Sequence, residues 1–565
     1  MKRSFFCILI FAVFLWLSSC GGETPEITTP VTEPLTEPQA EQATLPVTEP
    51  ITEPVTEAPL PPAEDFSLDI GGRYPLLDKK TSVTFENTAV NTVKKEIFGD
   101  NLAWRGNGYG VYDPQTKSFN MKLVEAIKKS GVTNIRYPGG IEGDFFIWHE
   151  TVGTSRKLQM DPFSDSYPTN APVSGLKYYP HFGFDEFFEL CRLANVEPVV
   201  QLNAGTGSAK DAADLVKYCL DKGIEVSSFA IGNEVNFKAE PVEGVRSTKT
   251  PEEYIAFAKE VYAELGDLAN EVELGVIGAP GAYALTADPT WDRKILTALG
   301  DKIDFIDCHI GYAPLFTLEG DKDEDILKAY MAAPTYLKVL LRTVKGEIKT
   351  YGGANAENIS IQITEYGPMG THYWGTVGST FLASYIQVML DEPMISSANH
   401  LPLLNHPYAP NLVGYMKTGE TENYWDNLST FIFRWYSEQI DRNVLKKNAD
   451  YPTFSSKKIG IVPAQTRAEM ANCAVYADEK GGTLFIINQA TKNGMEFNIS
   501  LPYDRIRITG VTELHNADPT VANTVKAPNL ISPKGYEVED KIYGGKLTVT
   551  TKPISVVKID FVIEK

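Results

Sequence analysis

Two glutamates that follow apolar runs are the first candidates for chemistry in this chain. Glu234 closes the segment FAIGNE, and Glu365 lies in the later segment ITEYG. Cleavage of a glycosidic bond without a metal needs two carboxyl groups in different protonation states. One protonates the leaving oxygen, and the other attacks or stabilises the reacting carbon. Two such glutamates, facing each other across one site, would predict a glycosidase.

Polar residues near the ends of other apolar runs would support such a pair. Asn233 carries an amide that can hydrogen-bond a sugar hydroxyl, and Arg136 supplies a fixed positive charge that would keep Glu365 ionised. His309 or Tyr312 could hydrogen-bond the same carboxylate. Taken singly, such residues are more often surface charges, structural ion pairs or core hydrogen-bonding groups. Their joint occurrence favours the catalytic interpretation.

Aromatic residues could line the sugar pocket, because sugars stack their C–H faces on aromatic rings. Simple packing of loops is the alternative for any one of them. Asn203 is a further candidate for substrate binding, whereas Glu142 and Asp144 are polar candidates that could equally be ordinary loop charges. The aromatic candidates, led by the two predicted substrate-binding tryptophans, are Trp104, Trp374, Tyr109, Trp148, Tyr312, Tyr366 and Tyr373.

These side chains need a scaffold that brings distant segments to one place. Short apolar, β-branched runs alternate with segments of helical period, which predicts a parallel sheet wrapped by helices. Eight such units favour an α/β fold with a closed (β/α)8 TIM barrel, whose catalytic side chains come from the carboxyl ends of the strands. The expected strands are 97–102, 132–137, 198–202, 226–231, 272–277, 303–309, 359–364 and 395–404, and the expected helices include 120–129, 183–194, 209–222, 251–268 and 327–343.

The barrel is expected to span residues 93–442, and a different pattern follows it. Strands without intervening helices are expected at 483–487, 495–499, 546–550 and 555–563. They predict a C-terminal all-β sandwich, jelly-roll-like, over 443–565. The segment 66–92 has no helix of its own, so we expect it to join this sandwich. A capping segment is the alternative.

At this point the chain resembles a known family. RYPGG, HFGFDEFFELC, QLNAGTG, FAIGNE and ITEYG occur in the order and spacing of glycoside hydrolase family 51, over nearly the whole folded region. The resemblance implies a retaining mechanism of clan A, with Glu234 as general acid/base and Glu365 as nucleophile. Asn233, Arg136, His309 and Tyr312 carry over as supporting residues. Many family members form hexamers, so a homo-oligomer is possible.

Two departures concern the sugar and not the catalytic pair. Arabinofuranosidases usually carry a Glu-His pair on the first strand, where this chain reads NLAW with Ala103. Near the eighth strand a Gln is usual before Leu-Val-Asn, where this chain reads LPLLN with Pro402. The spacing from His309 to Tyr312 is also one residue longer than expected. We therefore expect intact catalysis with rebuilt sugar recognition.

The N-terminus has the pattern of an export signal. Lys2 and Arg3 precede an apolar run over 5–17 that is too short to span a bilayer as a helix. The segment LSSC resembles a bacterial lipobox, which would make 1–19 a lipoprotein signal peptide and Cys20 the lipid-modified first residue. A plain signal peptide with an incidental Cys is the alternative. Acyl chains on Cys20 would anchor the exported protein to the bacterial cell membrane, facing the cell exterior.

Residues 20–65 contain repeated Thr-Glu-Pro units. Proline disfavours helix and sheet, and the segment has too few apolar residues for a core, which predicts a disordered Thr/Glu/Pro-rich linker. Such a linker would hold the enzyme away from the membrane, although it could instead be a ligand for a partner.

Charge and cysteine content exclude other classes. The formal net charge of -21 repels polyanions and argues against nucleic acid as a partner. No cysteine cluster has metal-ligand spacing and no complete phosphate-binding loop follows a strand, so no cofactor is expected. Four cysteines lie beyond the lipobox, and a bridge between Cys191 and Cys219 is open.

The leading hypothesis is a retaining glycoside hydrolase, α-L-arabinofuranosidase-like, that acts on a polysaccharide or oligosaccharide of plant type. An endo-β-glucanase or β-xylosidase of the same family is the alternative enzyme. A carbohydrate-binding surface lipoprotein is the alternative without catalysis, but a binder does not need two opposed carboxyl groups flanked by Arg and Asn.

Overall fold

The computed structural model of the chain describes residues 64–162, 175–236, 240–281, 283, 286–314, 317, 320–369, 374–404, 411–538 and 543–564. The signal peptide, Cys20 and nearly all of the linker lie outside the described residues, as does Tyr373. The chain from Pro62 onward forms one compact unit. Among the helices that the structure describes, none has the length and apolar character needed to cross a membrane.

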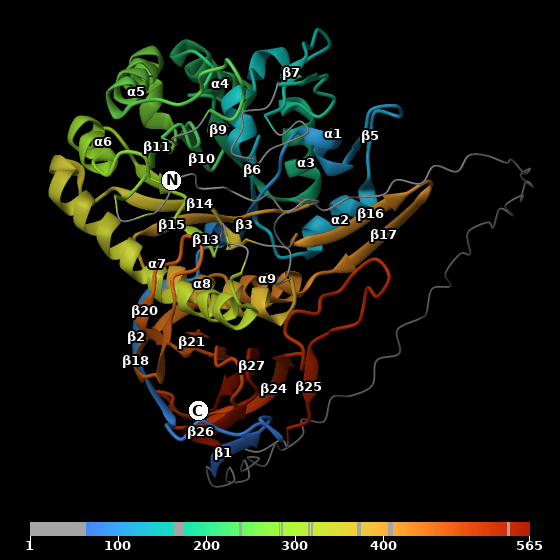
Figure 1. Ribbon diagram of the computed structural model, residues 1–565, viewed down its shortest axis with the longest axis vertical. Coiled ribbons are helices and arrows are strands. Elements are labelled where there is room, and N and C mark those ends of the chain that lie inside the picture. The colour runs from blue at the N-terminus through green and yellow to red at the C-terminus, as the bar shows by residue number, and fades with distance from the viewer. Residues whose placement is uncertain are drawn as a thin grey trace, which may run out of the picture. The chain divides into compact units, whose positions relative to one another are not determined.

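Eight parallel strands close into a barrel, which confirms the predicted fold class (Figure 1). Neighbouring strands pair in chain order, and the pairings of β12 with β14 and of β15 with β3 close the circle. Each predicted strand is present, because short β-branched apolar runs suit strands that are buried on both faces. The strands are β3 (Gly99–Asn101), β6 (Asn134–Tyr137), β9 (Glu197–Leu202), β10 (Ser228–Ile231), β11 (Leu274–Gly278), β12 (Phe305–Cys308), β14 (Ser360–Pro368) and β15 (Ile395–His400).

One short strand adds to the barrel rim. β13 (Gly311–Ala313) pairs in parallel with the end of β14, so that Tyr312 lies beside Gly367. This extra pairing extends the sheet beyond β12 and carries a predicted site residue toward the mouth of the barrel.

Helices wrap the barrel, and all five predicted helical segments are helical (Figure 1). α7 extends the predicted segment at both ends and contains Pro334. The segments named from the sequence do not include α6, α8, α9 or the short α1. The helices are α2 (Met121–Lys129), α3 (Phe184–Ala194), α4 (Ala209–Lys222), α5 (Pro251–Leu265), α6 (Trp291–Leu299), α7 (Asp323–Tyr351), α8 (Thr376–Leu390) and α9 (Leu428–Ser437), with the short α1 (Arg105–Tyr109).

The all-β part is one mixed sheet of ten strands that curls on itself, with β24 pairing both β27 and β26. Its core contains Phe66, Val83, Phe497 and Ile559. Two strands come from the N-terminal segment: β2 lies between β18 and β23, and β1 pairs with β26. In order across the sheet the strands are β1 (Glu64–Asp69), β26 (Tyr543–Thr551), β23 (Met495–Ser500), β2 (Thr81–Thr92), β18 (Asn443–Asp450), β21 (Ala471–Ala477), β22 (Gly481–Asn488), β27 (Ser555–Ile563), β24 (Ile506–Leu514) and β25 (Lys534–Tyr536).

Small two-stranded sheets decorate the barrel loops. The hairpin of β16 and β17 projects outward beside α2 (Figure 1). The pairs are β4 (Tyr112–Asp113) with β5 (Ser118–Phe119), β7 (Gln159–Met160) with β8 (Lys177–Tyr178), β16 (Val413–Thr418) with β17 (Thr421–Asp426), and β19 (Thr453–Ser456) with β20 (Gln465–Glu469).

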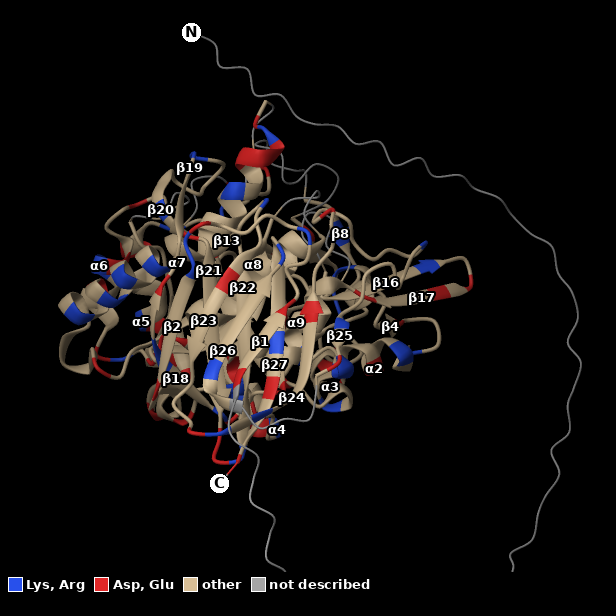
Figure 2. Cartoon of the chain, turned by 90° about the horizontal axis from the view of Figure 1, so that it is seen from below, with Lys and Arg blue, Asp and Glu red and all other residues tan. Residues whose placement is uncertain are grey.

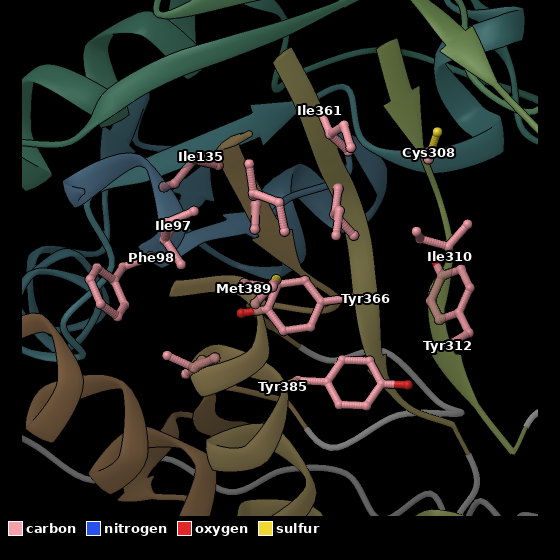
Figure 3. Close-up of a cluster of buried hydrophobic side chains, with 14 of the residues drawn as sticks. Ile97, Phe98, Ile135, Cys308, Ile310, Tyr312, Ile361, Tyr366, Tyr385 and Met389 are labelled. Atoms are coloured by element: carbon pink, nitrogen blue, oxygen red, sulfur yellow. The ribbon is translucent and has the colours of Figure 1, made fainter. Parts of the chain in front are cut away.

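Aromatic rings pack between the barrel wall and α8. The rings of Tyr366 on β14 and Tyr385 on α8 lie nearly parallel, 6.5 Å apart (Figure 3). Phe381 stacks on Tyr385 at 4.0 Å. All 15 residues of α8 are buried, because this helix also contacts β21, β22 and β27 of the curled sheet. The helix therefore joins two hydrophobic cores and has no solvent-facing side.

The cysteines in the described part of the chain are buried, and the charged residues are spread over the surface elements. Cys191, Cys219, Cys308 and Cys473 are buried and free, so Cys191 and Cys219 do not form the bridge that the sequence left open. Burial raises the pKa of Cys219 to about 12 and keeps its thiol protonated. Lys and Arg are interspersed with Asp and Glu over the elements seen in Figure 2.

A truncation tests the position of β2 inside the curled sheet. A chain that begins at Val93 lacks β1 and β2, which leaves β18, β23 and β26 with unpaired edges and removes the buried residues Phe66, Val83 and Phe85. We expect this chain to aggregate or to melt at least about 10 °C below a chain that begins at Pro62. Calorimetry measures both, and equal melting temperatures would contradict the arrangement.

Candidate active site

The carboxyl ends of five barrel strands, together with β13, place the predicted side chains at one end of the barrel. In a parallel barrel these ends share one rim, so residues far apart in sequence meet there. Arg136 lies on β6, Asn203 follows β9, Asn233 and Glu234 follow β10, His309 follows β12, Tyr312 lies on β13, and Glu365 lies within β14.

Glu365 is held as an anion. It is 4% exposed, and its Oε1 accepts a hydrogen bond from Arg136 Nη1 at 2.8 Å, while Tyr312 donates its hydroxyl to Oε2. Burial by itself raises the pKa of Glu365, but the positive charges of His309 and Arg136 outweigh burial and lower it below its usual value. A buried carboxylate that stays ionised is suited to act as a nucleophile.

Arg136 connects this carboxylate to the other side of the site. Its guanidinium is fully buried, and Nη1 also donates to Asn101 Oδ1 at 3.0 Å, while Nη2 donates to Asn233 Oδ1 at 2.7 Å. A buried charge needs such pairing, because desolvation is otherwise strongly unfavourable. The planar guanidinium therefore sets the orientation of Glu365 and Asn233 together.

Glu234 lies in the opposite electrostatic situation. Burial raises its pKa, and the negative charge of Glu365 raises it further. Its Oε1 lies 2.9 Å from Nδ1 of His309. Since Glu234 tends toward the protonated form and Glu365 toward the ionised form, the two carboxyl groups differ in the way that acid catalysis requires.

His309 bridges the pair. Nε2 lies 3.1 Å from Thr364 Oγ1 and 3.7 Å from Asp307 Oδ2, and Nδ1 lies 3.6 Å from Glu365 Oε2. Burial lowers the pKa of His309, but the surrounding carboxylates, above all Glu365, raise it to about 10. The sequence left open whether His309 or Tyr312 hydrogen-bonds Glu365. Tyr312 does so, whereas the hydrogen bond of His309 goes to Glu234.

The two carboxyl groups are close enough for a retaining mechanism. One oxygen of each and one ring nitrogen of His309 all lie within 4.8 Å of one another. Retaining glycosidases place their carboxyl groups roughly 5 to 5.5 Å apart, and inverting enzymes leave a wider gap for water. Among the described residues, these three side chains also form the group whose ligand atoms are close enough to hold a metal ion. Arg136 and Tyr312 already engage Glu365, which disfavours a cation there.

A pocket of about 350 Å³, part of it open to solvent, lies beside Glu234. It is lined by Asn233, Asn236, Tyr283 and His309, among others. The amide nitrogen of Asn233 has no hydrogen-bond partner among the described residues, although it is buried. This nitrogen can therefore donate to a bound sugar hydroxyl, as the sequence predicted for this residue.

Other predicted residues contribute structure around the pocket. Trp104 is 3% exposed and stacks on Phe146 at 5.3 Å. The Asn203 amide is engaged within its own loop, where Oδ1 accepts from the backbone N–H groups of Thr206 and Gly207, both at 3.0 Å. Trp374 is half-buried just before α8. The contacts of Trp104 and Asn203 stabilise the shape of their loops. Contacts of Trp104, Asn203 and Trp374 with a substrate stay predictions.

Several residues that sequence reasoning passed over complete the network. Asp307 accepts a hydrogen bond from Thr364 Oγ1 at 2.5 Å, and its pKa is lowered despite burial by His309 and Arg136. The Asn101 amide donates to the backbone carbonyls of Thr364 and His400. The signal for Asp307 was present, because a carboxylate inside an apolar strand is rarely buried without a charged partner.

Comparison with known proteins agrees with this geometry. Residues 126–246 match the family model described as "Alpha-L-arabinofuranosidase 1 domain". The chain is 21% identical over 548 residues to an intracellular exo-α-(1→5)-L-arabinofuranosidase of Bifidobacterium longum, covering 86% of this chain and 92% of that protein. Its fold is similar to a family 51 α-L-arabinofuranosidase from Bifidobacterium longum, with a TM-score of 0.70 at 21% identity over 85% of this chain and 99% of that one. Over most of its length the chain is thus similar to α-L-arabinofuranosidases, including one of glycoside hydrolase family 51.

The fold of this chain is also similar to that of a second solved structure. The α-L-arabinofuranosidase of Thermotoga maritima in complex with arabinose has a TM-score of 0.70 at 20% identity, covering 86% of this chain and all of that chain. Barrel and curled sheet are both within the shared part. Family 51 is a retaining family, which agrees with the short distance between Glu234 and Glu365.

Replacing one hydroxyl tests how Glu365 is held. Tyr312→Phe removes a hydrogen bond to a charged group, which contributes about 1.5 to 3 kcal/mol, so we expect kcat/KM to fall roughly 10- to 100-fold. The pKa of Glu365 should rise, which moves the acid limb of the pH–rate profile to higher pH, because the carboxylate then protonates sooner as pH falls.

Tyr366→Phe is the matched control. Tyr366 lies on the same strand as Glu365, but its hydroxyl has no hydrogen-bond partner among the described residues and its ring packs on Tyr385 (Figure 3). We expect no change in the pH profile. Equal losses in both variants would mean that Tyr312 acts only through packing.

Proposed function

We propose that the protein is a retaining α-L-arabinofuranosidase that cleaves arabinofuranosyl groups from plant-type polysaccharides or oligosaccharides. The observation that carries the proposal is the buried carboxyl pair, with the pKa of Glu234 raised, the pKa of Glu365 lowered and oxygens within 4.8 Å. The sugar follows from family relatives named as exo-α-(1→5)- and exo-α-(1→6)-L-arabinofuranosidases.

In the first step Glu365 attacks the anomeric carbon while Glu234 transfers its proton to the leaving oxygen. The bond from carbon to the leaving oxygen breaks, and an ester between the sugar and Glu365 forms. Arg136 and Tyr312 hold the attacking carboxylate in place. Asn233 offers its free amide N–H to a hydroxyl beside the reacting carbon.

In the second step Glu234, now ionised, takes a proton from water, and the water oxygen bonds to the same carbon. The bond from that carbon to Glu365 breaks, which releases the Glu365 carboxylate. Two inversions give net retention of configuration. His309 stabilises the ionised form of Glu234, because its raised pKa keeps the imidazole positively charged beside Oε1. The pKa of Glu234 thus falls when Glu365 is esterified and loses its charge, and rises again when the product leaves.

We also propose that the enzyme works outside the cell, tethered by lipid on Cys20. The lipobox-like LSSC and the Thr/Glu/Pro-rich segment after it support this placement. The relative from Bifidobacterium longum is named as intracellular, so the tether would distinguish this protein from it.

Azide rescue separates the roles of the two glutamates. Glu365→Ala should lower kcat on 4-nitrophenyl α-L-arabinofuranoside by about four orders of magnitude or more, because the nucleophile is lost. With azide, Glu234→Ala should give the arabinosyl azide of retained configuration, and Glu365→Ala the azide of inverted configuration. NMR of the products decides. The opposite pairing of variant and product would reverse the assignment, and a wild type silent on this sugar but active on β-xyloside would refute the substrate.

A labelling experiment tests the tether. In a bacterial host, the full-length chain should incorporate labelled palmitate and sediment with membranes, whereas Cys20→Ala should lose the label. Cys191→Ala, which changes a buried free cysteine, is the matched control and should keep it. An unlabelled full-length chain in the soluble fraction would contradict the lipid anchor.

A further inference from the structure

Glu142 lies beside the proposed nucleophile, on a segment that catalysis does not otherwise use. It belongs to the 3-10 turn Gly140–Phe145, which follows β6 directly after Arg136 and Tyr137. A Cβ atom at Gly140 would lie 3.1 Å from Glu142 Oε2 and 3.7 Å from Glu365 Oε1. The glycine, with φ of 79°, therefore leaves an open space that both carboxyl groups border.

Among the described residues, the carboxyl of Glu142 is hydrogen-bonded by its own backbone N–H alone. Glu142 is 4% exposed, yet its carboxyl receives no hydrogen bond from any side chain in the described part of the chain. Arg105, the cation that influences it most, makes its own ion pair with Asp161 at 2.7 Å. One backbone hydrogen bond uses only part of the capacity of a carboxyl group, which leaves Glu142 able to bind a ligand hydroxyl.

Burial raises the pKa of Glu142 to about 8, and the charge of Glu365 contributes to the rise. The group is therefore mostly a neutral acid at pH 7, which can donate one hydrogen bond and accept another. A sugar hydroxyl has the same capacity. An acid in this state complements a hydroxyl without adding a second negative charge next to the nucleophile.

We infer that Glu142 is a specificity-determining residue that hydrogen-bonds one hydroxyl of the sugar unit attached to Glu365. The inference rests on the proposed function, because it places that sugar over Gly140. A site built to hydrogen-bond a hydroxyl rejects sugars that lack it, since its buried polar group is then left unpaired. Glu142 thus selects the sugar, whereas Glu234 and Glu365 perform the reaction.

Asp144, on the same turn, offers a comparison. It is also buried with a pKa raised to about 8, but the charge that acts on it most is that of Glu234, and it accepts a hydrogen bond from the backbone of Asn233. It lies toward the acid/base, and its Oδ1 has no hydrogen-bond partner among the described residues. The two carboxyl groups therefore face different parts of the site.

A cycle of protein and substrate changes tests the contact. The substrates are 4-nitrophenyl α-L-arabinofuranoside and its 3-deoxy and 5-deoxy analogues, and the variants are Glu142→Met and Glu142→Ala. For the wild type we expect one analogue to lose roughly 10- to 100-fold in kcat/KM. On the parent sugar, each variant should lose a similar factor in kcat/KM relative to the wild type. On that analogue, the same substitution should lower kcat/KM little further, because the hydrogen bond is already absent. Glu142→Gln, which keeps a donor and an acceptor, should lose less.

Controls separate the inference from the proposed function. Asp144→Leu should lower activity by the same factor on all three substrates, and calorimetry should show that Glu142→Met melts no lower than the wild type. If both Glu142 variants lose activity by equal factors on all three sugars, or melt far lower than the wild type, Glu142 has a structural role and the inference fails. A wild type that does not cleave the parent sugar refutes the proposed function instead. The same cycle is then run on the aryl glycoside it does cleave, and if it cleaves none both proposals fall.

Discussion

The buried guanidinium of Arg136 is the interaction around which the site is arranged. It lies inside the barrel without exposure and binds Glu365, Asn233 and Asn101, which come from three other parts of the chain. A guanidinium keeps its charge at any pH that the fold survives, so of the two partners only Glu365 titrates. Removing either partner would leave an uncompensated charge in the barrel, which is strongly destabilising. The geometry of the site and the stability of the barrel are thus linked through one side chain.

The contrast between the two glutamates follows from where the positive charges lie. Both are buried, and burial raises the pKa of each. Glu365 is in direct contact with Arg136 and Tyr312. Among the described residues the hydrogen bond of Glu234 is with His309, whose charge is shared with Asp307 and Glu365. The same fold therefore supplies one acid and one anion through unequal access to cations.

Much of this was visible in the sequence, and the exceptions have physical reasons. The eight strands were found because β-branched apolar runs mark strands buried on both faces. Helix α8 was missed because all its residues are buried, so it lacks the polar face that produces a helical period. The hydrogen bond between His309 and Glu234 depends on how the segments after β12 and β10 meet, which no local pattern encodes. The sequence also could not show the importance of Glu142, since that lies in its burial beside Gly140 and Glu365, which is a property of the folded surroundings.

The curled sheet has a consequence for how the molecule is made. β2 lies between β18 and β23, and β1 pairs with β26, so residues from the two ends of the folded chain share one ladder. The first strands to leave the ribosome have no partners until the last ones have been synthesised, while the barrel can assemble from neighbours in chain order. Contacts between such distant segments form slowly, because loop closure must precede them. During synthesis, β1 and β2 therefore remain unpaired edges until the strands that follow the barrel have been made.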